Sequence, residues 1–87
     1  MIWEDVKKAY PNQWVIIEAI EAHTNGDKRI LESITVVDTF REDNNKALLE
    51  YVKLHRRYRD REMYVVHTSR HELDIIEQRW IGVRADI

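Results

Sequence analysis

One stretch of this 87-residue chain, residues 34–68, changes its residue pattern twice and so limits the folds open to it. Residues 34–40 are rich in β-branched side chains, residues 44–58 carry apolar side chains at helical spacing, and residues 63–68 are β-rich again. A strand, a helix and another strand in this order predict a small sheet with one amphipathic helix packed on it. The pattern therefore predicts an α+β fold, and it specifies no chemistry.

The residues before this stretch predict a short helix and a β-hairpin. Residues 1–10 place apolar side chains on one helical face, and Pro11 ends that helix because proline disfavours the helical conformation in the residue before it. Residues 14–40 contain two β-rich runs joined by Asn25-Gly26, a pair that readily forms a type I′ turn. We expect the two strands to pair antiparallel, with an irregular step at residues 31–33.

The residues after the hairpin predict a helix, a strand and a final cover. Residues 44–58 form the main helix, and residues 63–68 form the third strand. Because a strand–helix–strand crossover normally joins parallel strands, we expect a mixed sheet of three or four strands in the order strand, strand, helix, strand. Residues 69–83 predict a short C-terminal helix, since they open with the Ser-x-x-Glu shape of a capping box, or an extended segment that covers the sheet.

The predicted core combines the centres of the strands with an apolar stripe of the main helix. A tryptophan near each end of the chain then closes the other face of the sheet or its end. The predicted core side chains are Trp14, Ile16, Ile17, Val36, Leu48, Tyr51, Val52, Val65 and Val66, and the closing tryptophans are Trp3 and Trp80.

Composition favours one small globular domain over residues 1–87, with 44% hydrophobic and 34% charged residues. The chain has no cysteine, which excludes a disulfide framework or a cysteine-ligated metal and favours the cytoplasm. Its longest apolar run, residues 14–17, is far shorter than the roughly 20 residues that span a bilayer, so we expect no membrane partner. The net charge of −2 gives the whole chain no attraction to nucleic acid.

His67 and His71 lie four residues apart beside Glu72, a spacing that binds a metal when both histidines share one helix. Here His67 ends a predicted strand and His71 opens the next element. The two side chains therefore need not converge, and we expect neither a metal site nor a cofactor.

Three carboxylates, Glu18, Glu21 and Asp38, would meet if the hairpin pairs as expected, and such a cluster could bind Mg²⁺ or transfer protons. The simpler interpretation is a set of solvent-facing carboxylates. Neither serine lies in a Gly-x-Ser-x-Gly elbow, and two glycines are too few for a phosphate-binding loop. We predict that the protein is not an enzyme and has no catalytic residues, with a small metal-dependent hydrolase as a distant alternative.

Five cations gather near the end of the main helix, within residues 53–61. Such a patch could bind a phosphate backbone. The simpler interpretation is a helix C-terminus whose cations oppose the helix dipole and pair with acids such as Glu42, Glu50, Asp60 or Glu62. The cations are Lys53, Arg56, Arg57, Arg59 and Arg61.

A sheet of three strands leaves edges that a partner strand or a second copy of the chain can cover. Burial of an edge in a homodimer would also add to a small core. We therefore predict a non-enzymatic protein-interaction or regulatory module with an unknown protein partner, and self-association through a sheet edge is one form of it. The alternative is a nucleic-acid-binding accessory protein that uses the Lys53–Arg61 patch.

The segment Tyr10-Pro11-Asn12-Gln13-Trp14-Val15, followed by a hairpin and a helix that ends Tyr58-Arg59-Asp60-Arg61-Glu62, resembles a group of small bacterial proteins of unknown function. Those proteins open with Tyr-Pro-x-x-Trp-Val and run strand, strand, helix, strand, so the similarity covers Tyr10 to Thr68. Their second junction often reads Tyr-Pro-Asp-x-Glu, and Arg59 stands here in place of the proline. The resemblance implies a bacterial, cytoplasmic accessory protein, and it carries over no catalytic residue.

Overall fold

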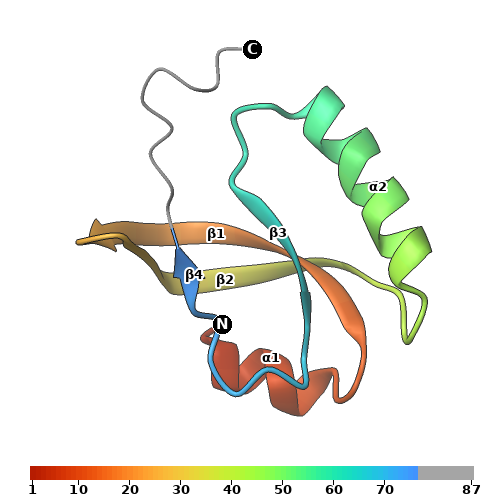
Figure 1. The fold of residues 1–87 in the computed structure, drawn as a ribbon, viewed down its shortest axis with the longest axis horizontal. Coiled ribbons are helices and arrows are strands. Elements are labelled where there is room, and N and C mark those ends of the chain that lie inside the picture. The colour runs from red at the N-terminus through yellow and green to blue at the C-terminus, as the bar shows by residue number, and fades with distance from the viewer. Residues whose placement is uncertain (77–87) are drawn as a thin grey trace.

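The structure, a computed structural model that describes residues 1–76, is a four-stranded sheet with two helices (Figure 1). The α+β class and the order strand, strand, helix, strand are confirmed. Neither described helix has the length and apolar character needed to cross a membrane. In chain order the elements are α1 (Trp3–Ala9), β1 (Trp14–Asn25), β2 (Lys28–Thr39), α2 (Asn44–Arg57), β3 (Met63–His67) and β4 (Ile75–Ile76).

β1 and β2 form the expected antiparallel hairpin, paired from Val15–Thr39 to Asn25–Lys28. The central turn residues are Gly26 and Asp27, and only Gly26 has positive φ, at 65°. One positive φ at the first central position is typical of a type II′ turn, so the predicted type I′ turn is wrong. The irregular step expected at residues 31–33 is present, because the register shifts between the pairs Glu21–Ser33 and Ala22–Leu31.

β3 pairs antiparallel with β1, from Trp14 opposite His67 to Glu18 opposite Met63. β2 and β3 run in the same direction, as a crossover requires, but β1 lies between them in the sheet order β3-β1-β2-β4. Every paired neighbour is therefore antiparallel, and the sheet is not mixed as predicted. The reason lies in β1, whose start is apolar on both faces and is best buried as a central strand.

The described part of the predicted C-terminal element contains no helix. The backbone N–H of Ser69 bonds to Nδ1 of His67, and the Ser69 hydroxyl lies 2.9 Å from the same nitrogen, so Ser69 does not cap a helix. The chain instead runs to β4, which pairs with Lys28 and Arg29 and extends the sheet. Residues 77–83 and Trp80 lie outside the described residues.

The main core lies between α1 and one face of the sheet (Figure 1). Val6, on the short helix, is completely buried, and Trp3 and Tyr10 pack against the same cluster, as the shared helical face predicts. The buried members of this cluster are Val6, Val15, Ile17, Ile34 and Val66.

α2 packs against β1 and β3 on the opposite face, which carries buried Ile16 and Met63 because neighbouring strand residues alternate between faces. The prediction that Leu48 and Val52 belong to the core is wrong, since they are 50% and 44% exposed. The helix has two adjacent apolar stripes, and only one of them can face the sheet. The stripe that faces the sheet contains buried Ala47 and half-buried Tyr51, Leu54 and Tyr58. The remaining predicted core side chains, Trp14, Val36 and Val65, lie on the strands and are half-buried.

Candidate interaction surface

The outer side of α2 exposes three aliphatic side chains. Leu48, Leu49 and Val52 are 50%, 65% and 44% exposed. At 3.6 residues per turn, Leu48 and Leu49 lie four and three positions before Val52, so all three adjoin on one side of the helix. Figure 1 shows α2 beside the sheet with its outer side facing away from it. The helix thus presents an apolar stripe to the surroundings.

Cations border this stripe toward the end of the helix. Lys53 and Arg56 are exposed and, by helical spacing, adjoin Leu49 and Val52. Within residues 1–76, Lys53, Arg56 and Arg59 form no ion pair. We call the set Leu48, Leu49, Val52, Lys53 and Arg56 the α2 surface.

Arg61 differs from the other cations because it holds the sheet and α2 together. Its Nε and Nη2 atoms donate to the Glu18 carboxylate at 2.9 and 2.6 Å, and its guanidinium lies 4.9 Å from the centre of the Tyr58 ring. These hydrogen bonds lower the pKa of Glu18. Arg61 therefore has a structural partner on the sheet. Arg57 lies 5.6 Å from the centre of the neighbouring Tyr58 ring, and it forms no ion pair within residues 1–76.

Two of the acids expected to neutralise the basic patch, Glu42 and Glu62, bind other residues. Glu62 accepts two hydrogen bonds from Arg29, each 2.8 Å, and a third from the Tyr64 hydroxyl at 2.5 Å. The Arg29 hydrogen bonds lower the pKa of Glu62, while burial and the hydrogen bond to Glu62 raise the pKa of Tyr64. Glu62 thus links the start of β3 to Arg29 near the turn of the hairpin. It forms no ion pair with the cations of α2.

His67 joins Glu42 and Ser69 in a contact that the sequence did not indicate. Because the Ser69 N–H donates to Nδ1 of His67 at 3.1 Å, we assign the ring proton to Nε2, which donates to Glu42 Oε1 at 3.0 Å. The order Ser69, His67, Glu42 resembles a hydrolase triad. However, the Ser69 N–H and the Arg70 N–H both bond to His67, so neither is available to stabilise an oxyanion. The Glu42 side chain is also 75% exposed, and the arrangement fastens the end of β3 to the loop before α2.

The other sequence candidates do not gather into a site. The His67 ring packs edge-on against Trp14, with ring centres 5.1 Å apart, and no described hydrogen bond joins it to His71. Glu18 lies opposite Thr35 and binds Arg61, while Asp38 lies opposite Ile16. Residues 1–76 contain no group of three or more histidine, aspartate or glutamate side chains placed to hold a metal ion.

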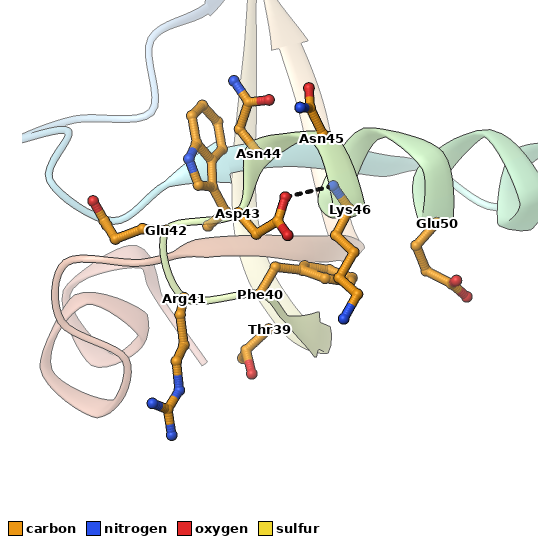
Figure 2. A pocket seen from close by; sticks show the side chains of 10 residues that line it. Thr39, Phe40, Arg41, Glu42, Asp43, Asn44, Asn45, Lys46 and Glu50 are labelled. Carbon is orange, nitrogen blue, oxygen red and sulfur yellow. Dashed lines mark hydrogen bonds between the residues drawn. The ribbon is translucent and has the colours of Figure 1, made fainter.

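A hollow of about 1120 Å³ lies beside the start of α2. Figure 2 shows the side chains of Arg41 and Glu42 pointing away from each other and from Asn44 and Asn45, and its dashed line joins the Asp43 carboxylate to the Lys46 N–H. A small-molecule site is usually concave and apolar, with a few polar groups aimed at one point. This hollow has polar walls and no such convergence, so it supports no small-molecule site.

Comparison with known proteins adds no relative, because no family model, curated protein or solved structure matches this chain. Of the candidates considered above, the α2 surface is the one that the geometry of the chain supports best. The density of cations in residues 53–61 indicates Lys53 and Arg56 in the sequence, whereas the helical spacing of Leu48 and Val52 predicts that they belong to the core, and no pattern singles out Leu49.

Proposed function

We propose that this protein is a non-enzymatic protein-interaction module that binds its partner through the α2 surface. The observation that supports this function is the exposure of Leu48, Leu49 and Val52 on one side of one helix. Complete burial of a fully exposed aliphatic side chain contributes about 1.5–3 kcal/mol, and a partner that covers these three, which are about half exposed, gains part of that amount from each. A contiguous apolar patch with a polar rim is typical of protein interfaces.

The α2 surface is a better candidate than the sheet edges for this role. β3 and β4 lie at the two ends of the sheet order and contain five and two residues. Within residues 1–76, β4 pairs only with Lys28 and Arg29, so the rest of β2 is also an edge, and Met1 covers it at Ile34 through hydrogen bonds to both backbone groups. Short edge strands and covered edges are two ways in which proteins prevent pairing with another chain. We place the module in the bacterial cytoplasm, supported by the absence of cysteine and by the resemblance of residues 10–68 to small bacterial proteins.

A second candidate function is nucleic-acid binding, supported by the lack of ion pairs at Lys53, Arg56 and Arg59 within residues 1–76. Phosphate contacts by these cations would make binding fall steeply with salt. This function leaves the exposed aliphatic side chains without a role, which is why we place it second. Binding of labelled duplex DNA and single-stranded RNA, compared with binding by Arg56→Glu/Arg57→Glu, tests it.

The test of the leading function is capture of partners from nuclease-treated native lysate by three tagged proteins. They are the unmodified chain, Leu49→Asp, and Ile20→Asp as a control with the same charge change at a strand residue that is 55% exposed. We expect a stoichiometric partner, or an untagged copy of this chain, with the unmodified protein and Ile20→Asp but not with Leu49→Asp. Equal recovery with all three, or no stoichiometric partner with any, would rule out the α2 surface.

A further inference from the structure

We infer that the partner on the α2 surface is a second copy of this chain, packed so that the two α2 helices run antiparallel about a two-fold axis. The inference rests on the proposed function and names its partner. In such an isologous contact the same patch serves both copies and must be complementary to itself. The position of the apolar stripe and the order of charges along α2 both meet that requirement.

The apolar stripe lies at the middle of the helix. α2 spans Asn44–Arg57, and the exposed aliphatic residues lie on both sides of its midpoint. A two-fold axis through that midpoint places Leu49 of one copy opposite Val52 of the other and Leu48 opposite Lys53, so the two stripes overlap over most of their length. A stripe near one end would overlap itself only if most of each helix extended past its partner.

The charges along the helix are ordered for the same arrangement. Glu42 and Asp43 precede α2, whereas Arg56 and Arg57 end it. The first turn of α2 itself contains no acid, so antiparallel packing sets the two acids that precede the helix in one copy against the basic end of the other. Parallel packing would set arginines against arginines, and like charges across an interface are unfavourable. Glu42 Oε1 is bonded to His67 Nε2, but the side chain is 75% exposed, so Glu42 Oε2 can accept from a neighbouring molecule.

The size of the contact predicts a weak dimer. A helix of 14 residues is about 21 Å long, and one face of it buries less than the roughly 800 Å² per partner of a standard interface. We therefore expect reversible dimerisation at protein concentrations on the order of tens of micromolar or above.

Sedimentation velocity over a hundredfold range of protein concentration tests for the second copy. We expect a monomer–dimer equilibrium for the unmodified chain and for Ile20→Asp, and a monomer throughout for Leu49→Asp. A chain that stays monomeric throughout overturns the inference, as does dimerisation that Leu49→Asp leaves unchanged. If the chain is monomeric but Leu49→Asp still loses a lysate partner, the proposed function stands with a different partner. If no partner is lost either, both fail.

Crosslinking tests the antiparallel direction. Since the chain has no cysteine, Asn45→Cys and Arg56→Cys each introduce a unique thiol on the side of α2 that carries the stripe. With a short bismaleimide crosslinker, we expect a mixture of the two variants to give at least severalfold more mixed dimer than Asn45→Cys gives crosslinked to itself. Self-crosslinking of Asn45→Cys that equals or exceeds the mixed product would contradict the antiparallel arrangement.

Discussion

The two helices contribute to this molecule in opposite ways. α1 has seven residues and completely buries Val6 in the main core. α2 has fourteen residues, yet its buried side chain is Ala47, and it leaves three aliphatic side chains exposed. The difference shows that the length of a helix does not measure its share of the core. The short helix completes the fold, whereas the long one keeps a face that a partner can cover.

The attachments of the two helices differ in the same way. α1 is tied along its length, since Trp3 Nε1 donates to the Arg70 carbonyl at 3.1 Å and Lys7 Nζ to the His71 carbonyl at 2.8 Å. α2 instead packs on β1 and β3 through the side chains of one stripe, with Ala47 buried and Tyr51 and Leu54 half-buried, while Asp43 caps its start and Arg61 stacks on Tyr58 at its end. This packing uses one side of the helix and leaves the other side for the α2 surface.

The largest difference in stability should appear between two truncations of aliphatic side chains, one in the core beneath α1 and one on the outer side of α2. Ile17→Ala should lower the free energy of unfolding by about 2–5 kcal/mol, because it opens a cavity in the α1 core. Leu49→Ala should change it by no more than about 0.5 kcal/mol, since that side chain is 65% exposed. Urea unfolding of both variants, at concentrations where the chain is monomeric, measures the contrast. Equal losses would mean that α2 is packed as tightly as α1.

Loss of the α2 cap should have a smaller effect. The Asp43 carboxylate accepts a 3.0 Å hydrogen bond from the Lys46 N–H, and Asp43→Ala should lower stability by about 1 kcal/mol. Asn44→Ala, an exposed neighbour, is the control and should stay within about 0.5 kcal/mol. Urea unfolding gives the free energies, and circular dichroism shows whether helix content falls. An unchanged Asp43→Ala would show that the end attachment of α2 does not stabilise it.

The acid dependence of stability should depend on the Arg29–Glu62 contact. Arg29 holds the pKa of folded Glu62 below its ordinary value of 4.5. The contact therefore stabilises the fold fully above that value, and the stabilisation is lost as the pH falls through the lower folded-state pKa. Glu62→Gln should be less stable near neutral pH and should lose less stability on acidification than the unmodified chain.

Glu21→Gln is the matched control for this pH series, because Glu21 is exposed and forms no ion pair within residues 1–76. It should follow the unmodified chain from about pH 6 to about pH 3 in urea unfolding. If Glu62→Gln also follows the unmodified chain, the contact with Arg29 adds nothing to stability.

The parts of the fold that depend on local pattern were predictable from the sequence. The shared face of Trp3, Val6 and Tyr10 indicates α1, and the Asn25-Gly26 pair indicates the hairpin. The place of β3 beside β1 was not predictable, because it depends on pairing between residues far apart in the chain. The crossover rule describes the direction of β2 and β3 correctly, but it does not say which strand lies between them.

The candidate site was only partly predictable for a related reason. The density of Lys53, Arg56 and their neighbours marks a basic helix end in the sequence alone. Which apolar stripe faces the sheet depends on packing, and Leu48 and Ala47 are adjacent residues with opposite burial. The contact of His67 with Glu42 needs β1 to be paired with both β2 and β3, and no local spacing in the sequence indicates it.

The most direct test of an open, self-complementary α2 surface is the concentration dependence of its nuclear magnetic resonance signals. Methyl signals of Leu48, Leu49 and Val52 should shift as the protein is concentrated, while that of Val6 in the α1 core stays fixed. Shifts confined to β3, β4 or the part of β2 that β4 does not pair would instead place self-association at a sheet edge. An absence of shifts at any concentration would contradict self-association through α2.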